Sequence, residues 1–560
     1  MDSQPVAGVE LVPHYYRNNF RALCDTVEAQ YGDLLTGPEQ QFLQDFRKLP
    51  FDAQCLYVRL VSRVGPWFRE SKLAYPELGP IPAALDSLIA SGMAELAQAL
   101  YVEELGGLYT VPELRQVFGP LLGDSVRGNK SQLLEAIAEL ALEDAELMSL
   151  LEAIDSERII APCGLAEVAL FQLLFFGNRY QSLTEFVLSD LGVARYYPYP
   201  LDRQHRLFAH REAVEEYLAC AELSDYWYEL REGEEASALP QLAEEVLNLD
   251  IRFPSSEIRW HRLCNGLARD LERLGELNSA ASLYECSARH PARERRLRIL
   301  ERLEDWSGAV RLSEHILDEP WCEEERDAAE RVLPRVQRKL GAVPTRRRRD
   351  DFPRLDLELT REEVPVEVLA ARQLESQWGQ VRYVENTLMN ALFGLAFWEQ
   401  IFAPVPGAFH NPFQGVPTDM YSPDFRARRR PALEARMEQL RVEGVEPLLQ
   451  EAYTRYASFQ CRWVDWRRFD AALLKTATRV IPDTHLLAVW ERMLFDPREN
   501  RRGFPDLIAL GEESGDYCLI EVKGPGDALQ ESQKRWLRFF ARQGIPASVA
   551  WVSWQEKPDD

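Results

Sequence analysis

The chain has 560 residues, 46% of them hydrophobic, and a formal net charge of −25, so three or four folded domains are expected. Its first residues lack a basic region followed by an apolar core, and no apolar run is long enough to span a bilayer. Nine cysteines without a Cys-x-x-Cys pair argue against a disulfide framework and against a structural zinc site. We therefore expect no membrane association and a reducing compartment.

The negative charge is unevenly distributed along the chain. Residues 1–372 contain 42 basic and 64 acidic residues, whereas the remainder contains 23 and 26. Basic clusters occur at residues 346–349, 426–430 and 498–502, and each could meet phosphate groups. The overall charge therefore does not exclude a nucleic-acid partner for the C-terminal part.

The first hundred residues are predicted to form amphipathic helices. Residues 42–49 and 53–63 carry apolar residues at helical spacing, separated by charged positions. Helices of this size with short basic elements resemble winged-helix modules. We expect residues 1–100 to form a helical, winged-helix-like domain.

Two short helices are predicted in residues 101–150. Thr110 can cap the first helix and Pro112 suits its first turn, while the second helix begins after residues 128–129. This helix, loop and Gly-Asn-Lys-Ser-x-Leu-Leu pattern resembles a SAP box, a small DNA-binding hairpin. Arg127 and Lys130 at the start of the second helix are candidate phosphate contacts. The alternative is a helical connector without a binding role.

An internal repeat is visible in residues 257–340. Residues 274–283 align with residues 303–312 at an offset of 29, and both carry alanine and leucine at matching positions. This spacing is shorter than a tetratricopeptide repeat, so we expect residues 151–370 to form a TPR-like stack of helices.

Two predicted strands near the C-terminus contain the most informative residues. Residues 505–510 and 517–523 are apolar and β-branched, and turn-forming residues between them favour a hairpin. Side chains alternate along a strand, so Glu521 and Lys523 share a face, and Asp506 could lie beside Glu521. Two carboxylates and one ammonium suit metal-assisted hydrolysis of a phosphodiester. An ordinary hairpin with solvated carboxylates is the alternative.

The next elements extend this pattern. Residues 529–540 have helical periodicity and include Gln533, and residues 547–552 are predicted to form a third strand. Strand, strand, helix, strand resembles the core of PD-(D/E)XK nucleases, with Pro505-Asp506 followed by Glu521-Val522-Lys523.

Flanking residues are similar to the VRR-Nuc subgroup of these nucleases. They comprise Arg501-Arg502-Gly503-Phe504 before the aspartate and Gln533-Lys534-Arg535-Trp536 after the turn. A predicted helix opened by residues 383–388 fits the same subgroup. The resemblance implies that Glu385 on this helix completes a metal site.

A longer insert narrows the resemblance to one family. The segments are residues 406–414, 417–420 and 428–436. They are similar to the insert of the Fanconi-associated nucleases, and the chain lacks the N-terminal zinc finger of vertebrate members, as expected of a bacterial member. The resemblance implies a structure-selective DNA nuclease, with 5′-flap endonuclease and 5′–3′ exonuclease activity, that acts in interstrand crosslink repair.

The resemblance also implies roles for individual residues. Asp506, Glu521, Glu385 and the carbonyl of Val522 would bind Mg²⁺ or Mn²⁺, Lys523 would assist the attacking water, and Gln533 would orient the phosphate or a ligand. Arg498, Arg501 and Arg502 are further candidate DNA contacts. Some relatives have a lysine immediately before the glutamine, where this chain has Ser532, so the resemblance does not extend to a terminal 5′-phosphate pocket that uses this lysine.

The expected architecture is therefore multi-domain, with a mostly α-helical N-terminal part and an α/β nuclease domain over residues 371–560. Branched or flapped DNA is the expected partner, bound by a monomer in the bacterial nucleoid, or in the nucleus of a eukaryote. DNA-repair proteins are expected as further partners. Two alternatives remain: a nuclease similar to Holliday-junction resolvases, and a non-catalytic helical scaffold.

Overall fold

The computed structural model describes residues 14–63, 65–123, 128–152, 157–179, 181, 195–233, 235–343 and 350–555. The chain divides into two compact units. The first comprises Met1–Ala194 with Leu201–Arg203, and the second comprises Arg195–Pro200 with Gln204–Asp560.

The first unit begins with four helices and a small antiparallel sheet. The sheet has the order β1-β3-β2, and α9 packs against α1. The bounds are α1 (Tyr15–Tyr31), α2 (Gly37–Lys48), α3 (Phe51–Val61), β1 (Phe68–Arg69), η1 (Glu70–Lys72), α4 (Ile81–Ala90), β2 (Ala94–Leu96), β3 (Ile159–Pro162) and α9 (Leu165–Phe176). This mixture of helices and a short sheet agrees with the winged-helix-like expectation.

Four helices are inserted between β2 and β3 of this sheet. They are α5 (Val102–Leu108), α6 (Val111–Leu122), α7 (Lys130–Ala138) and α8 (Asp144–Glu152). Thr110 and Asn129 cap α6 and α7, and Leu114, Phe118 and Leu133 contribute to a separate core. The two helices of the SAP-like pattern are thus present. Because β3 and α9 follow the insertion, the first unit continues beyond residue 150, where the sequence predicted the helical stack to begin.

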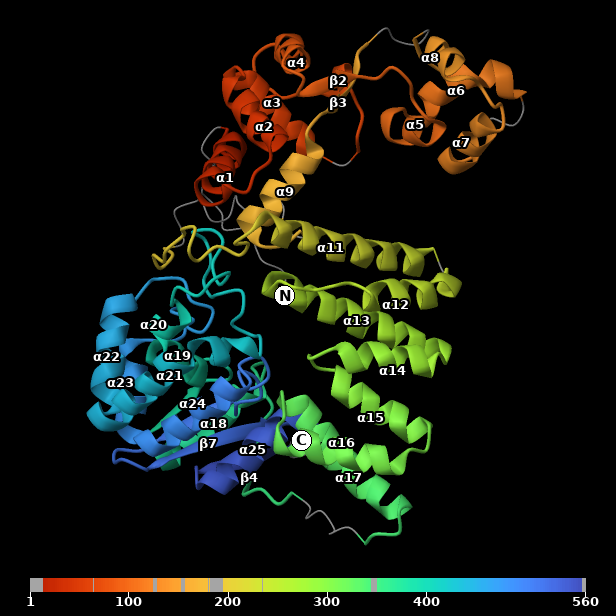
Figure 1. Ribbon diagram of the computed structural model, residues 1–560. Coiled ribbons are helices and arrows are strands. Elements are labelled where there is room, and N and C mark those ends of the chain that lie inside the picture. Colours follow the sequence, from red (N-terminus) through yellow and green to blue (C-terminus); the bar gives the residue numbers. More distant parts are fainter. Residues whose placement is uncertain are drawn as a thin grey trace, which may run out of the picture. The chain divides into compact units, whose positions relative to one another are not determined.

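The second unit opens with a stack of helices, each contacting its neighbours (Figure 1). The bounds are α11 (Arg211–Glu232), η4 (Ala236–Ala238), α12 (Leu239–Leu247), α13 (Pro254–Leu274), α14 (Leu277–Cys286), α15 (Ala292–Arg302), α16 (Trp306–Asp318) and α17 (Glu323–Lys339). The two copies of the predicted repeat include the first residues of α14 and of α16. Ala280 and Ala309 occupy matching positions, 29 residues apart, and both are fully buried. Small side chains at these positions let neighbouring helices approach closely.

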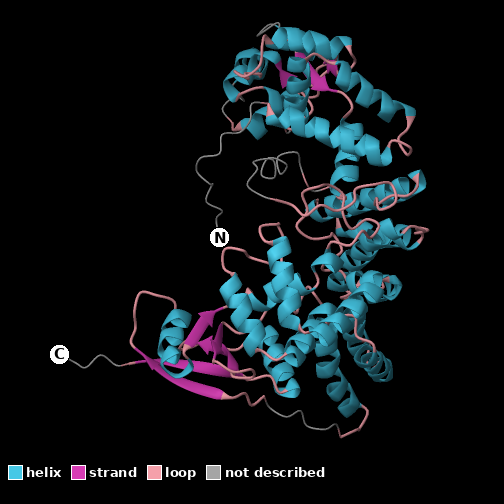
Figure 2. Cartoon of the chain, turned by 90° about the vertical axis from the view of Figure 1, so that its left-hand side faces the viewer, coloured by secondary structure: helices cyan, strands magenta, loops and turns pink. Residues whose placement is uncertain are grey.

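A five-stranded mixed sheet follows, shown in magenta with its neighbouring helices in Figure 2. Its order is β4-β8-β7-β6-β5; β8 is parallel to β4 and β7, and β6 is antiparallel to β5 and β7. The bounds are β4 (Arg354–Leu359), α18 (Val366–Trp378), β5 (Gln380–Tyr383), β6 (Leu507–Leu510), β7 (Tyr517–Lys523), α25 (Glu531–Gln543) and β8 (Ala547–Trp554). The predicted hairpin, helix and third strand are confirmed. The sheet also includes β4, upstream of the expected domain start at residue 371, which falls within α18.

A helical lobe separates β5 from β6. Its helices are α19 (Leu388–Ala396), α20 (Trp398–Ile401), α21 (Asp424–Glu443), α22 (Val445–Tyr456), α23 (Ala471–Val480) and α24 (Asp483–Phe495). The helix predicted to open at Tyr383 begins instead at Leu388, since Tyr383 ends β5. Backbone pairing of β5 with β6 outweighs the helical periodicity there. Among the described residues, no helix combines the length and apolarity that crossing a membrane requires.

Gly503 is a conformational requirement of the segment that leads into β6. Its φ is +79°, and an added Cβ would lie 2.8 Å from atoms of Ser532. Gly526 has a similar φ of +90°, but an added Cβ there would meet nothing within 4 Å. The first glycine therefore combines a left-handed backbone with a close approach to the start of α25, whereas the second has the backbone requirement alone.

We predict that Gly503→Ala destabilises the second unit more than Gly526→Ala does. Left-handed strain costs about 1–2 kcal/mol in both variants, and the crowding at Ser532 adds about 1–3 kcal/mol in the first. Urea unfolding measures the two free energies. Equal losses would show that the contact with Ser532 adjusts without cost.

Candidate active site

The β6–β7 hairpin brings Asp506 and Glu521 opposite one another. Leu507 pairs with Ile520, so the residues immediately before and after them face each other across the two strands. The Oδ2 atom of Asp506 accepts a hydrogen bond from the backbone N–H of Val522 at 2.8 Å. The predicted juxtaposition of the two carboxylates is thus present, and one of them is fixed by the main chain.

Glu521 is held by two side chains that contact the same oxygen. Lys523 Nζ lies 2.9 Å from Glu521 Oε1, and Gln533 Nε2 donates to that atom at 2.6 Å. Gln533 is itself held by the backbone N–H of Gln530, which donates to its Oε1 at 2.8 Å. The second oxygen of Glu521, Oε2, is buried and has no hydrogen-bond partner among the described residues. One carboxylate oxygen is therefore fixed while the other is available to a ligand.

Glu385 reaches the same site from the turn after β5. Tyr383 Oη donates to its Oε2 at 2.5 Å, and Asn386 Nδ2 donates to its Oε1 at 3.1 Å. The backbone N–H of Val384 donates to the carbonyl of Asp506 at 2.8 Å, which ties the turn to the hairpin. The sequence predicted a helix here; the structure has a turn, with Asn386 at a φ of +49°.

Burial and the charges of nearby carboxylates raise the pKa values of Asp506 and Glu521. Burial raises the pKa of Glu521 to about 8, the charges of Asp506 and Glu385 add to this, and Lys523 opposes it. The pKa of Asp506 rises to about 6, again mainly through burial, although the hydrogen bond from Val522 lowers it. Without a cation, the site therefore retains a proton near neutral pH.

These features fit a hard divalent cation. Asp506, Glu521 and Glu385 offer carboxylate oxygens, and the unpartnered Oε2 of Glu521 gains a partner if a cation binds. A cation would also offset the negative charges that raise both pKa values. The backbone N–H of Val522 contacts Asp506; its carbonyl remains a predicted ligand.

Three residues near the site were not predicted. Glu367, in the first turn of α18, raises the pKa of Asp506 through its charge. Tyr383 contacts Glu385, and the guanidinium of Arg468 lies 5.2 Å from the centre of the Tyr383 ring. Glu367 and Arg468 lie far from the hairpin in sequence, and neither has a motif spacing that could identify it.

The predicted DNA-contacting residues differ in their exposure. Arg498 and Arg502 are exposed, whereas Arg501 packs 4.6 Å from the centre of the Tyr421 ring and donates to its hydroxyl at 3.3 Å. In the first unit, Lys130 begins α7 and is half-buried, and Arg127 lies outside the described residues. Arg498 and Arg502 are therefore more accessible to DNA than Arg501, which packs against Tyr421.

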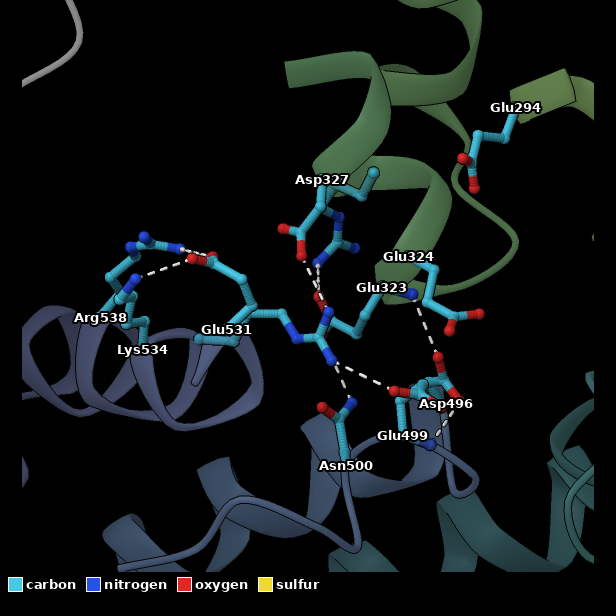
Figure 3. A network of polar contacts seen from close by, with 12 residues as sticks. Glu294, Glu323, Glu324, Asp327, Asp496, Glu499, Asn500, Glu531, Lys534 and Arg538 are labelled. Carbon is cyan, nitrogen blue, oxygen red and sulfur yellow. Dashed lines mark hydrogen bonds and ion pairs between the residues drawn. The ribbon is translucent and has the colours of Figure 1, made fainter. Parts of the chain in front are cut away.

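The segment that carries these arginines is attached to α17 of the helical stack (Figure 3). Asp496 Oδ2 accepts a hydrogen bond from the backbone N–H of Glu323 at 3.1 Å. The Glu323 carboxylate contacts Arg492 at 3.1 Å and accepts from Asn500 at 3.3 Å. Arg535 on α25 bridges Asp327 and Glu499. The stack therefore contacts α25 and the segment that leads into Asp506.

We predict that the metal-free protein loses stability as pH rises from about 5 to about 8. Because the folded-state pKa values of Asp506 and Glu521 exceed their ordinary values, the folded chain binds more protons than the unfolded chain across this range. The melting temperature of Glu521→Gln, measured relative to that of wild type, should therefore increase as the pH rises. Each kcal/mol of stability that wild type loses should change this difference by roughly 2–4 °C. Thermal melts in chelator measure this. A difference that does not change with pH would contradict the raised pKa of Glu521.

Models of three known domains match successive parts of the chain. They are the FAN1 HTH domain over residues 14–95, the Fanconi anemia-associated nuclease SAP domain over 99–147, and the VRR-NUC domain over 441–554. The third range includes the hairpin, Lys523 and Gln533, and the second includes both capped helices of the insertion.

Known proteins resemble the chain over nearly its full length. A Fanconi-associated nuclease 1 homolog from Pseudomonas aeruginosa is 37% identical over 548 residues, which cover 97% of this chain and 96% of the relative. The human Fanconi-associated nuclease 1 is 24% identical, over 96% of this chain and 62% of its own length.

A crystal structure of paFAN1 bound to 2-nucleotide 5′-flap DNA with a gap matches with a TM-score of 0.81. The two chains are 35% identical, and the match covers 100% of each. The bacterial relative, the three domain models and the carboxylate site agree on one assignment. The chain is a bacterial member of the Fanconi-associated nuclease family and thus a metal-dependent, structure-selective DNA nuclease.

Proposed function

We propose that this protein cuts 5′ flaps as an endonuclease, degrades DNA 5′ to 3′ as an exonuclease, and acts in interstrand crosslink repair. The observation that carries the proposal is the convergence of Asp506, Glu521 and Glu385, with Lys523 against one oxygen of Glu521 and the other oxygen unpartnered. The repair role follows from the family to which the chain belongs.

The chemistry is hydrolysis of one phosphodiester bond. A bound Mg²⁺ or Mn²⁺ supplies a water of lowered pKa and offsets charge on the phosphate. Asp506, Glu521, Glu385 and the Val522 carbonyl would hold the ion, and Gln533 keeps Glu521 oriented through its hydrogen bond. Lys523 lies where it can position the attacking water. Water oxygen bonds to phosphorus as the bond to the 3′ oxygen breaks, which leaves a 5′-phosphate and a 3′-hydroxyl.

The expected substrate is branched DNA, bound through its phosphates. Two crystal structures of the relative paFAN1 contain 5′-flap DNA with a gap, one with a 1-nucleotide and one with a 2-nucleotide flap. Contacts to phosphate fix the position of a protein on DNA without reading bases. Arg498 and Arg502 near the hairpin, and Arg127 and Lys130 in the SAP-like region, are the residues we propose for these contacts.

The remaining assignments are proposed on the same basis. The winged-helix-like and SAP-like parts would bind duplex arms, and the TPR-like stack would brace the nuclease sheet. We propose that the protein acts as a monomer on DNA in the bacterial nucleoid and works alongside other DNA-repair proteins. A panel of flap, nick, splayed-arm and four-way substrates tests the choice of substrate. Fastest cutting of the four-way junction would favour a resolvase-like nuclease instead, and no cutting of any would favour a scaffold.

Asp506→Asn should abolish cleavage while flap binding persists. The substitution keeps an acceptor for the N–H of Val522 but weakens the metal site. Loss of a group that only supports a metal ligand costs 10–100-fold, so loss of a ligand should cost more than roughly 100-fold. Asp516→Asn, on an exposed residue of the same hairpin, is the matched control. Cleavage rates at saturating DNA measure both, and full activity of Asp506→Asn would remove this residue from the site.

The double variant Arg498→Ala, Arg502→Ala should bind the flap more weakly. If each arginine contacts one phosphate, the slope of log K against log salt should fall by about 1.8, since each contact releases about 0.9 counterion. Turnover at saturating DNA should stay close to wild type. The matched control is Arg441→Ala with Arg455→Ala, two exposed arginines of the helical lobe paired with nearby glutamates. An unchanged salt slope would show that the Arg498–Arg502 segment does not contact DNA.

A further inference from the structure

The end of the helical stack brings together three residue types that bind soft or borderline metal ions. His290 lies in the connection between α14 and α15, Cys322 is the N-cap of α17, and Glu324 lies in the first turn of α17. A ring nitrogen, the thiol sulfur and a carboxylate oxygen of these residues all lie within 4.8 Å of one another. Cys322 and Glu324 follow His290 by 32 and 34 positions, which matches no common zinc-binding motif. The sequence alone therefore indicates no zinc site here.

A fourth residue orients the histidine. His290 Nε2 lies 3.1 Å from Glu294 Oε2, and His290 Nδ1 lies 3.3 Å from Glu324 Oε2. When Nε2–H donates to Glu294, the lone pair of Nδ1 faces a carboxylate oxygen. That arrangement is repulsive unless a proton or a cation lies between the two atoms. A histidine whose other nitrogen donates to a carboxylate is the usual arrangement of a metal ligand.

The spacing of the nitrogen and oxygen donors suits tetrahedral coordination. Zinc binds imidazole nitrogen and carboxylate oxygen at about 2.0–2.2 Å. Two such ligands at a tetrahedral angle lie about 3.3–3.5 Å apart, and the Nδ1 to Oε2 distance is 3.3 Å. The thiol of Cys322 supplies the third donor and favours zinc over magnesium, because magnesium prefers oxygen ligands. A water can complete the four positions.

The surroundings add negative charge. Figure 3 shows Glu324 beside the segment that carries Asp496 and Glu499. Burial raises the pKa of Glu324, the charges of Glu499 and Asp496 raise it further, and His290 and Arg498 oppose the rise. A divalent cation would offset this excess charge.

From this geometry we propose that His290, Cys322 and Glu324 bind a zinc-class divalent cation, with Glu294 as the carboxylate that orients His290. The ion would join the α14–α15 connection to the N-terminus of α17. That terminus also contacts Asp496, which begins the segment leading into the active site. This cation would be separate from an ion at the nuclease site, whose proposed ligands are all oxygen atoms.

Cobalt(II) titration of the full chain, stripped of metal, tests the proposal. A thiolate ligand gives Co²⁺ an intense charge-transfer absorption that carboxylate sites lack. We expect one equivalent of this absorption in wild type, displaced by Zn²⁺ but not by Mg²⁺. Cys322→Ser should abolish it, whereas the control Cys286→Ser, which removes the exposed cysteine of α14, should keep it. No absorption in wild type, or absorption that survives Cys322→Ser, would overturn the proposal.

Two further variants guard against simple misfolding. Glu294→Gln should retain the thiolate absorption but weaken Co²⁺ affinity about 10–100-fold, because the group acts through His290. Glu324→Gln changes a half-buried residue and should lower affinity without loss of the fold. Zn²⁺ alone should raise the melting temperature of wild type more than that of either variant. Equal affinity in wild type and Glu294→Gln would contradict the role given to Glu294 as the carboxylate that orients His290.

Discussion

The nuclease site depends on the burial of two carboxylates opposite each other on one hairpin. Asp506 and Glu521 are 8% and 1% exposed; burial raises both pKa values, and the charge of Asp506 makes ionisation of Glu521 less favourable still. Lys523 and the amide of Gln533 contact one oxygen of Glu521, and a backbone N–H contacts Asp506. The other oxygen of Glu521 has no partner among the described residues. Such a site is poorly suited to stability but well suited to a cation, whose binding would satisfy the oxygen and relieve the repulsion.

The surrounding architecture positions this hairpin from both sides. The turn after β5 is tied to Asp506 by a main-chain hydrogen bond and brings Glu385 to the site. On the other side, Asp496 and Asn500 connect the segment before β6 to Glu323 on α17 (Figure 3). The helical stack is therefore part of the support of the active-site segment. The proposed cation at His290 and Cys322 would stiffen the same end of the stack.

The hairpin was predictable because its information is local. Strand propensity and alternation predict that Asp506, Glu521 and Lys523 lie together within a short stretch of sequence. The antiparallel pairing of β6 with β7, which sets Leu507 opposite Ile520, confirms that Asp506 and Glu521 are neighbours. Glu385 was identified through family resemblance, but its element was wrong, because pairing with β6 cannot be seen from the sequence around Tyr383. β4, Glu367 and the insertion of the SAP-like helices between β2 and β3 depend on contacts between distant segments. No local periodicity encodes such contacts.

Proton release on Mg²⁺ binding is the most direct test of this view of the site. Calorimetric titration of the DNA-free protein near pH 7, in buffers of different ionisation enthalpy, counts the protons released for each ion bound. The raised pKa of Glu521, about 8, predicts that Mg²⁺ displaces close to one proton at this pH and fewer as the pH rises above 8. Binding that releases no protons at pH 7 would show that the hairpin carboxylates are already ionised, and would contradict the account of the site as a cluster that a cation completes.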